Sequence, residues 1–216
     1  MMIFDRKNET LAPEPLAQLQ LERLQALMAR LRRNVPRYRN TLGDIRIESL
    51  ADLGRVPPTT PEDLSAAFPY GMFALPLREV IRLHSTTGAG GVPLVVGHTR
   101  NDLTQWGRLA ARQLVAAGCT SHDVIQIGFS GGTFSQSMAY ILGAELIEAS
   151  VIPQDTPHPH RQLTVMQNFR ASILITTPTQ ARELIQALRE RNTDPQSLQL
   201  RVVLLSRLAP AEEREE

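Results

Sequence analysis

The chain contains a single cysteine and a single lysine in 216 residues. Cys119 alone forms no intramolecular disulfide and supports no cysteine-based zinc cage, which favours a reducing setting such as the cytoplasm. Lys7 is the only lysine among 23 basic residues, and it lies close to the N-terminus. Lysine chemistry is therefore almost excluded for this sequence.

Aromatic residues, net charge and long apolar runs are also scarce. Aromatics make up 5% of the chain and the formal net charge is +1, which argues against a base-stacking platform and against strong attraction to nucleic acid or an acidic membrane. No apolar run approaches the ~20 residues of a membrane-spanning helix. Residues 1–6 show neither a long apolar core nor a cleavage signature, so no signal peptide is expected. These absences predict a cytoplasmic protein with no nucleic-acid and no membrane partner.

The remaining composition is that of an ordinary globular protein, with 42% hydrophobic and 21% charged residues. Residues 16–33 carry apolar side chains at helical spacing. These side chains are Leu16, Leu19, Leu24, Leu27, Met28 and Leu31. The arginines of this segment are predicted to form its solvated face rather than a phosphate-binding surface. In the proline-rich residues 52–76, Thr60 followed by Pro61 predicts the start of a short helix.

From residue 80 onward the pattern alternates between strands and helices. Strands are expected at 80–84, 94–97, 123–129, 146–152, 172–176 and 201–205, and helices at 100–117, 134–142, 161–169 and 179–191. This alternation predicts an α/β fold with a mostly parallel sheet flanked by helices, after a helical N-terminal segment. Three regions follow from it: 1–79, helical and proline-rich; 80–210, α/β; and 211–216, a frayed tail.

The sheet also predicts where a ligand binds. Ligands of parallel sheets bind beyond the carboxyl ends of the strands. The loops after His84, Phe129, Thr176 and Leu205 are therefore the expected positions of a site.

A glycine-rich loop between the first two expected strands is the most informative segment. It contains Ser85, Thr86, Thr87, Gly88, Ala89, Gly90 and Gly91. Exposed backbone N–H groups and hydroxyls in such a loop form a nest that holds phosphate oxygens. Taken alone, a plain tight hairpin explains these residues better than a phosphate loop does.

The surrounding sequence resembles the phenylacetate–coenzyme A ligase branch of the adenylate-forming enzymes. The family core Gly-Thr-Thr-Gly-Lys-Pro is similar to Gly88–Pro93, and the stretch Val95–Trp106 resembles this branch in particular. So do Phe68–Ala74 and the early stretch 19–39. The resemblance runs in collinear order from about residue 10 to about residue 205, and it implies the N-terminal part of the large ligase domain.

The resemblance implies an ATP-dependent acid–thiol ligase that forms an acyl-adenylate and then a coenzyme A thioester. ATP or AMP with Mg²⁺, and an aryl or acyl carboxylate, are the ligands that it implies. The sequence departs from the family at the loop, where Val92 replaces the lysine and Ala89 and Gly90 replace the two threonines. Charge-assisted contacts are about twice as strong as neutral ones, so triphosphate binding is expected to be weak. No residue is assigned a catalytic role.

Two later segments are similar to family loops near the acyl and nucleotide site. The pocket residues that they imply, together with a histidine at the mouth of the glycine-rich loop, are His84, Phe129, Gly131, Gly132, Phe134, Thr177 and Pro178. Five of these residues have an alternative explanation: core packing for the phenylalanines, a strand-to-helix turn for Thr177 and Pro178, and a satisfied strand-end histidine for His84. After residue 205 the family's adenine motif is replaced by Ser206–Pro210.

The family's later metal-binding acid, its ribose-binding aspartate and its C-terminal domain with the catalytic lysine are not found in this sequence. A truncated ligase-like scaffold that does not complete acyl-CoA synthesis alone is therefore expected. One subunit of a split ligase, and a protein-interaction module that reuses the scaffold, remain as alternatives. The sheet edge near residues 201–205 is expected to be open, which predicts a homodimer or a partner chain.

Isolated reactive residues point to no separate chemistry. His158 and His160 lack nearby cysteines or acidic clusters, so a solvated loop is expected there rather than a metal site. Cys119 follows the expected C-terminus of a helix, whose dipole disfavours a thiolate. No metal site is predicted.

Overall fold

The computed structural model describes residues 2–86, 91–129, 136–153 and 158–205. The chain divides into two compact units, Asp5–Asn101 and Met1–Phe4 with Asp102–Glu216. The sequence pattern predicts a boundary between residues 79 and 80, and this boundary stays a prediction.

The first unit is mainly helical. Its elements are α1 (Arg6–Glu9), α2 (Pro13–Asn34), α3 (Pro36–Leu42), η1 (Leu50–Arg55), α4 (Pro61–Ala66), η2 (Leu77–Glu79), β1 (Arg82–Thr86) and β2 (Leu94–His98). Met28, Leu42 and Ile47 form its small buried core. The helix expected over 16–33 is thus present as α2, and proline occupies its first turn.

Thr60 caps α4 as the sequence predicts. Its side chain accepts from the backbone N–H of Asp63, and the Asp63 carboxylate accepts from the backbone N–H of Thr60. This reciprocal capping box satisfies two donors that a helix start leaves free. Pro61 has the first helical position, where its missing N–H costs nothing.

The β1–β2 hairpin corrects one expectation about the sheet. The two strands pair antiparallel, with Arg82 opposite His98 and Thr86 opposite Leu94. They form a two-stranded sheet of their own rather than part of the parallel sheet. β1 is therefore not one of the parallel strands whose carboxyl ends are expected to bind a ligand, because it pairs antiparallel with the next strand of the chain.

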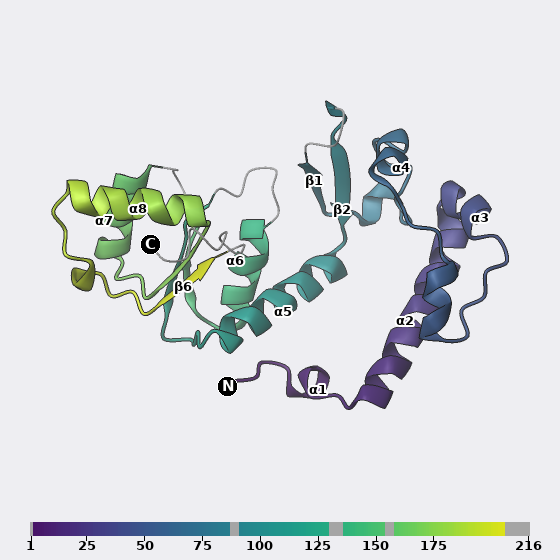
Figure 1. Cartoon of the computed structure of the whole chain (residues 1–216), viewed down its shortest axis with the longest axis horizontal. Coiled ribbons are helices and arrows are strands. Elements are labelled where there is room, and N and C mark those ends of the chain that lie inside the picture. The colour runs from purple at the N-terminus through teal and green to yellow at the C-terminus, as the bar shows by residue number, and fades with distance from the viewer. Residues whose placement is uncertain (1, 87–90, 130–135, 154–157, 206–216) are drawn as a thin grey trace. The chain divides into compact units, whose positions relative to one another are not determined.

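The second unit is the predicted α/β fold (Figure 1). Its elements are α5 (Arg100–Ala116, whose first two residues fall in the helical unit), β3 (Val124–Ile127), α6 (Gln136–Leu146), β4 (Ser150–Ile152), α7 (Pro159–Asn168), β5 (Ile173–Thr176), α8 (Pro178–Glu190), η4 (Pro195–Ser197) and β6 (Val202–Leu205). The strands are parallel throughout and lie in the order β4-β3-β5-β6.

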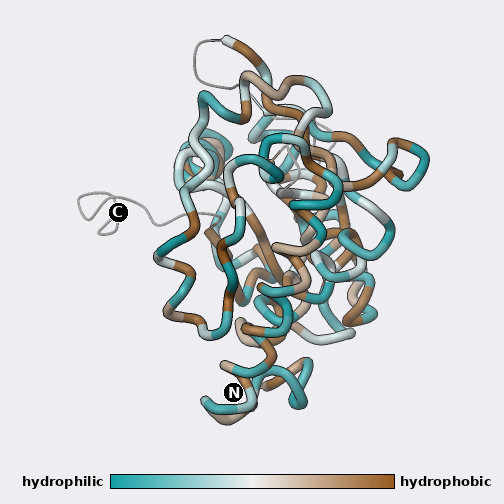
Figure 2. Tube along the Cα trace, turned by 90° about the vertical axis from the view of Figure 1, so that its right-hand side faces the viewer, coloured by the Kyte–Doolittle hydropathy of each residue, from teal (hydrophilic) through white to brown (hydrophobic). Residues whose placement is uncertain are grey.

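Helices cover this sheet on both faces. One buried cluster joins β3 and β5 to Leu114 of α5 and Ala144 of α6. The other joins Leu174 of β5 to Leu163 of α7 and Leu184 of α8, and Figure 1 shows α7 and α8 side by side. Hydrophobic and hydrophilic residues alternate along the helices in Figure 2, as one-sided burial requires.

The region around residue 146 departs from the sequence expectation. A strand was expected over 146–152, but α6 continues to Leu146 and β4 begins only at Ser150. Glu148, with a φ of 61°, turns the chain between them. Apolar residues lie on both sides of this turn, Leu146 and Ile147 before it and Val151 and Ile152 after it, so hydropathy alone does not separate the helix end from the strand.

No helix within the described residues is long and apolar enough to cross a membrane.

Candidate functional site

The sheet order places a topological switch point at the carboxyl ends of β3 and β5. From β3 the chain crosses through α6 to β4 on one side, whereas β5 lies on the other side of β3 and leads through α8 to β6. In sheets of this kind ligands bind at the switch point, beyond the carboxyl ends of the strands. Ile127 pairs with Ile175, so the next residues, Gly128 and Thr176, lie beside each other at this point.

Gly128 is closely packed where the chain leaves β3. Its N–H donates to the Ile175 carbonyl over 2.7 Å. A Cβ at this position would lie 2.9 Å from the Thr176 hydroxyl oxygen, closer than carbon and oxygen pack. Only glycine fits here without a shift of β5, because the obstructing residue is fully buried.

Two buried glutamines connect the same point to α7. The side-chain amide of Gln126 donates to the Gln162 backbone carbonyl over 3.2 Å. The side-chain amide of Gln162 donates to the Gly128 carbonyl over 3.3 Å. Both side chains are at least 95% buried, and the Gln126 carbonyl oxygen has no hydrogen-bond partner among the described residues.

Thr177 and Pro178 form the turn from β5 into α8. The Thr177 hydroxyl accepts from the Gln180 backbone N–H over 3.2 Å and donates to the Gln180 side chain over 2.9 Å. Pro178 is buried at the first helical position. The strand-to-helix explanation for this pair is therefore confirmed, and the turn lies at the carboxyl edge.

Phe129 packs inside the unit. It is 7% exposed and meets Tyr140 edge-on, with ring centroids 6.3 Å apart. The core-packing alternative is thus confirmed for this side chain, while its part in an acyl slot stays a prediction. Gly131, Gly132 and Phe134 lie outside the described residues.

The residues of the glycine-rich loop belong to the helical unit. Ser85 and Thr86 end β1, and His84 is a buried residue of that strand whose ring meets His98 edge-on at 5.2 Å. Gly91 has a φ of 80°, which side chains rarely adopt. Thr87, Gly88, Ala89 and Gly90 lie outside the described residues. Val92, at the position of the family lysine, is 38% exposed.

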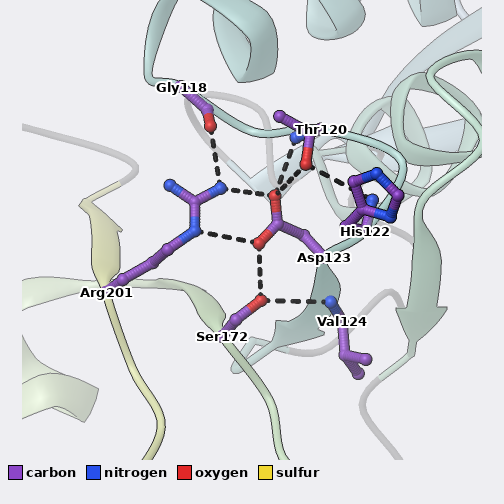
Figure 3. A network of polar contacts seen from close by, with 7 residues as sticks. All are labelled: Gly118, Thr120, His122, Asp123, Val124, Ser172 and Arg201. Carbon is purple, nitrogen blue, oxygen red and sulfur yellow. Dashed lines mark hydrogen bonds and ion pairs between the residues drawn. The ribbon is translucent and has the colours of Figure 1, made fainter.

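The opposite, amino edge of the sheet is closed by an ionic network (Figure 3). Arg201 Nε donates to Asp123 Oδ1 over 3.0 Å, and the second carboxylate oxygen also accepts from this guanidinium. Ser172 donates to Asp123 over 2.7 Å, and the Thr120 backbone N–H over 2.7 Å. Burial alone would raise the pKa of Asp123, but these donors outweigh it and lower the pKa to about 2.

No candidate metal centre emerges elsewhere in the part of the chain that the structure describes. Within the described residues no three His, Cys, Asp or Glu side chains gather closely enough to hold a metal ion. Both ring nitrogens of His160 meet neighbouring side chains, with Nε2 3.0 Å from Glu190 and Nδ1 accepting from Arg191. Cys119 is buried, and burial raises the pKa of its thiol to about 11.

The chain has clear relatives among curated proteins. It is 35% identical over 209 residues to a phenylacetate–coenzyme A ligase of Thermus thermophilus, a match that covers 94% of this chain and 47% of that protein. It is 33% identical to the phenylacetate–coenzyme A ligase of Escherichia coli over 200 residues, or 90% of this chain and 46% of that protein. The chain is a partial, N-terminal relative of these adenylate-forming ligases. No family model matches it.

The solved structures agree with this ligase-like fold. An open conformation of 2-hydroxyisobutyryl-CoA ligase, in complex with 2-HIB-AMP and CoA, matches with a TM-score of 0.85 at 24% identity. The match covers 96% of this chain and 51% of that ligase. The chain therefore spans about half the length of the relatives and solved ligases that it matches.

The sequence predicts a site at the carboxyl strand ends, but it did not single out the buried glutamines that lie there. Neither Gln126 nor Gln162 was among the expected residues, although Gln126 interrupts an apolar strand, Val124–Ile127. A lone amide in a buried strand is a usable signal, because burying it without a partner is costly. The contact between Arg201 and Asp123, which are 78 residues apart, has no comparable pattern in the sequence.

Proposed function

We propose that this chain is a ligase-like scaffold that binds an acyl-adenylate or AMP at the carboxyl edge of its parallel sheet. The observation that carries the proposal is the 35% identity over 209 residues to a phenylacetate–coenzyme A ligase. The switch point between β3 and β5 in the strand order supports it, since doubly wound sheets bind ligands at that place. An aryl or acyl carboxylate is the substrate class.

The residues proposed to bind such ligands are considered unit by unit. In the α/β unit, Phe129, Gly131, Gly132, Phe134, Thr177 and Pro178 are proposed to contact the acyl and nucleotide groups. In the helical unit, His84 and the residues Ser85–Gly91 are proposed, by themselves, as a phosphate-binding nest of backbone N–H groups and hydroxyls. No charged group is among these nest residues, and Val92 stands where the family has lysine. The chain is therefore proposed to hold a monophosphate ester better than a triphosphate, and to leave acyl-CoA synthesis incomplete alone.

Among the described residues no three His, Cys, Asp or Glu side chains lie close enough together to hold Mg²⁺. Neutral donors and shape are proposed to hold the ligand. A cytoplasmic setting is proposed from the single, buried thiol.

The outer edge of β6 is proposed to pair with another β-strand, from a second copy or a partner chain. Within the described part of the chain no strand pairs with this edge. Val203 and Leu205 on β6 are 48% and 45% exposed, and exposed apolar edges favour strand addition.

Light scattering on a sizing column tests this edge pairing for a homodimer. Val203→Lys should reduce the dimer and Leu109→Lys, on an exposed position of α5, should not; a monomer under all conditions excludes the homodimer.

Isothermal titration with AMP, ATP–Mg²⁺ and a phenylacetyl-adenylate analogue tests ligand binding. Saturable binding of AMP or the analogue supports the proposal, and weaker binding in Gly91→Ala tests the separate proposal of a phosphate nest in the helical unit. Gly43→Ala is the matched control, because Gly43 also has a positive φ and open space around it but lies outside the loop. Absence of heat with every ligand, on folded protein, contradicts the small-molecule function and favours an interaction module.

A further inference from the structure

Gly128 is held on both sides at the point where the chain leaves the central strand β3. On one side its N–H donates to the Ile175 carbonyl of β5 over 2.7 Å. On the other its carbonyl accepts from the Gln162 side chain of α7 over 3.3 Å. The first bond continues the sheet, whereas the second is made by a side chain 34 residues away.

The bond from Gln162 is part of a reciprocal pair of bridges. Gln126, two residues before Gly128, donates to the backbone carbonyl of Gln162 over 3.2 Å. The first turn of α7 and the end of β3 are thus joined twice, by two amides that are each at least 95% buried. Buried amides in a dry environment have few alternative partners, so their geometry is strongly fixed.

We propose that Gln162 is a positioning residue: its amide fixes the Gly128 carbonyl and so sets the direction in which the chain leaves β3 at the carboxyl edge of the sheet. Phe129, the next residue, packs against Tyr140, and its backbone path depends on where Gly128 is held. The Thr176 hydroxyl blocks Gly128 from the β5 side. Gln162 therefore supplies the remaining support that a preformed carboxyl edge needs.

Hydrogen exchange of Gln162→Met tests this positioning without any ligand. Methionine keeps the length and shape of the side chain but removes the amide donor. A peptide that spans Gly128 and Phe129 should exchange about tenfold faster or more, as the loss of a buried hydrogen bond predicts. A peptide over β6, away from the bridges, should stay within about twofold of the unmodified chain.

The matched control is Gln186→Met on α8. The amide of Gln186 also donates to a side chain, that of Glu190 over 2.9 Å, but at an exposed position, so exchange at Gly128 should not change. If Gln162→Met does not fold, Gln162→Asn replaces it, because it keeps the amide but is one methylene too short to reach. Unchanged exchange at Gly128, or a uniform rise across the whole unit, overturns the proposal.

The expected effect of Gln162 on ligand binding rests on the proposed function. A failure of the proposed function can be told apart from a failure of the positioning proposal. In Gln162→Met the affinity for the acyl-adenylate analogue should fall about tenfold in a folded protein, as expected when a preformed site must be ordered on binding. If the unmodified chain binds no analogue, the proposed function fails while the exchange result still decides the positioning. Faster exchange with unchanged affinity contradicts the role of Gln162 in the site.

Discussion

Arg201 and Asp123 are 78 residues apart in sequence, and the guanidinium donates from Nε to the Asp123 carboxylate over 3.0 Å. A second guanidinium nitrogen reaches both the carboxylate and the Gly118 carbonyl. Asp123 precedes β3 and Arg201 precedes β6, so the pair holds the amino edge of the sheet. The carboxyl edge, which the proposed function uses, is held by different groups, the Gln126 and Gln162 amides.

Removing the cation of this pair should destabilise the fold. Arg201→Met leaves Asp123, whose side chain is 5% exposed, as a buried charge with fewer donors. The expected loss is about 2 kcal/mol, below the range for fully buried pairs because Arg201 itself is half exposed. Urea unfolding measures it. Arg55→Met breaks an exposed pair with Asp52 and should cost less than about 0.5 kcal/mol; equal losses would contradict a special role for Arg201.

Acid should weaken the same network in a defined window. The native pKa of Asp123 lies at about 2, below its ordinary value of 3.8. As the pH falls, the unfolded chain takes up this proton first, so the stability contributed by Asp123 is full above pH 3.8 and is lost towards pH 2. Asp123→Asn, which does not titrate, should therefore lose less stability than the unmodified chain over this window. Parallel curves from urea unfolding at several pH values would refute the assignment.

Helices α5 and α6 approach closely enough to require glycine at position 143. A Cβ on Gly143 would lie 2.7 Å from the Ala110 Cβ and 2.8 Å from the Ala111 nitrogen. Gly143→Ala should cost about 1–3 kcal/mol through overpacking, measured by thermal or urea unfolding. Gly54→Ala is the control, because nothing lies within 4 Å of its added methyl group. A neutral Gly143→Ala would show that the two helices separate without cost.

Cys119 should be unreactive in the native protein. Burial raises the pKa of its thiol to about 11, so very little nucleophilic thiolate exists near neutral pH. At pH 8 a thiol reagent should modify the folded chain at least ~100-fold more slowly than the urea-unfolded chain, because both thiolate fraction and access are reduced. Comparable rates would show that the core around Cys119 opens readily.

Patterns along the sequence predicted most of the elements in the structure. Helical periodicity located α2, and the Thr60–Pro61 pair located the start of α4. Strand–helix alternation after residue 80 predicted a parallel sheet, which the structure confirms for β3 to β6. Local signals of this kind are strong because capping and amphipathic burial act over a few residues.

What the sequence did not predict depends on contacts between distant residues. The glycine-rich segment indicated a β1–β2 hairpin, which the structure shows. The sequence did not show that this hairpin forms a sheet of its own, because a short apolar strand looks alike in either sheet. The end of α6 at Leu146 depends on the turn at Glu148 rather than on hydropathy. The sequence marks Gln126 as a lone amide in an apolar strand, but its partner Gln162 is known only from the fold, which brings α7 against β3.

The most direct test of the account is where an acyl-adenylate analogue contacts the chain. In an NMR titration of isotope-labelled protein, the account predicts saturable shifts at Phe129, Thr177 and the Gln162 side-chain amide. The amide signals of Asp123, Ser172 and Arg201, at the opposite edge of the sheet, should not shift. Shifts confined to the amino edge, or no saturable shift at all, would contradict a ligand site at the carboxyl ends of β3 and β5.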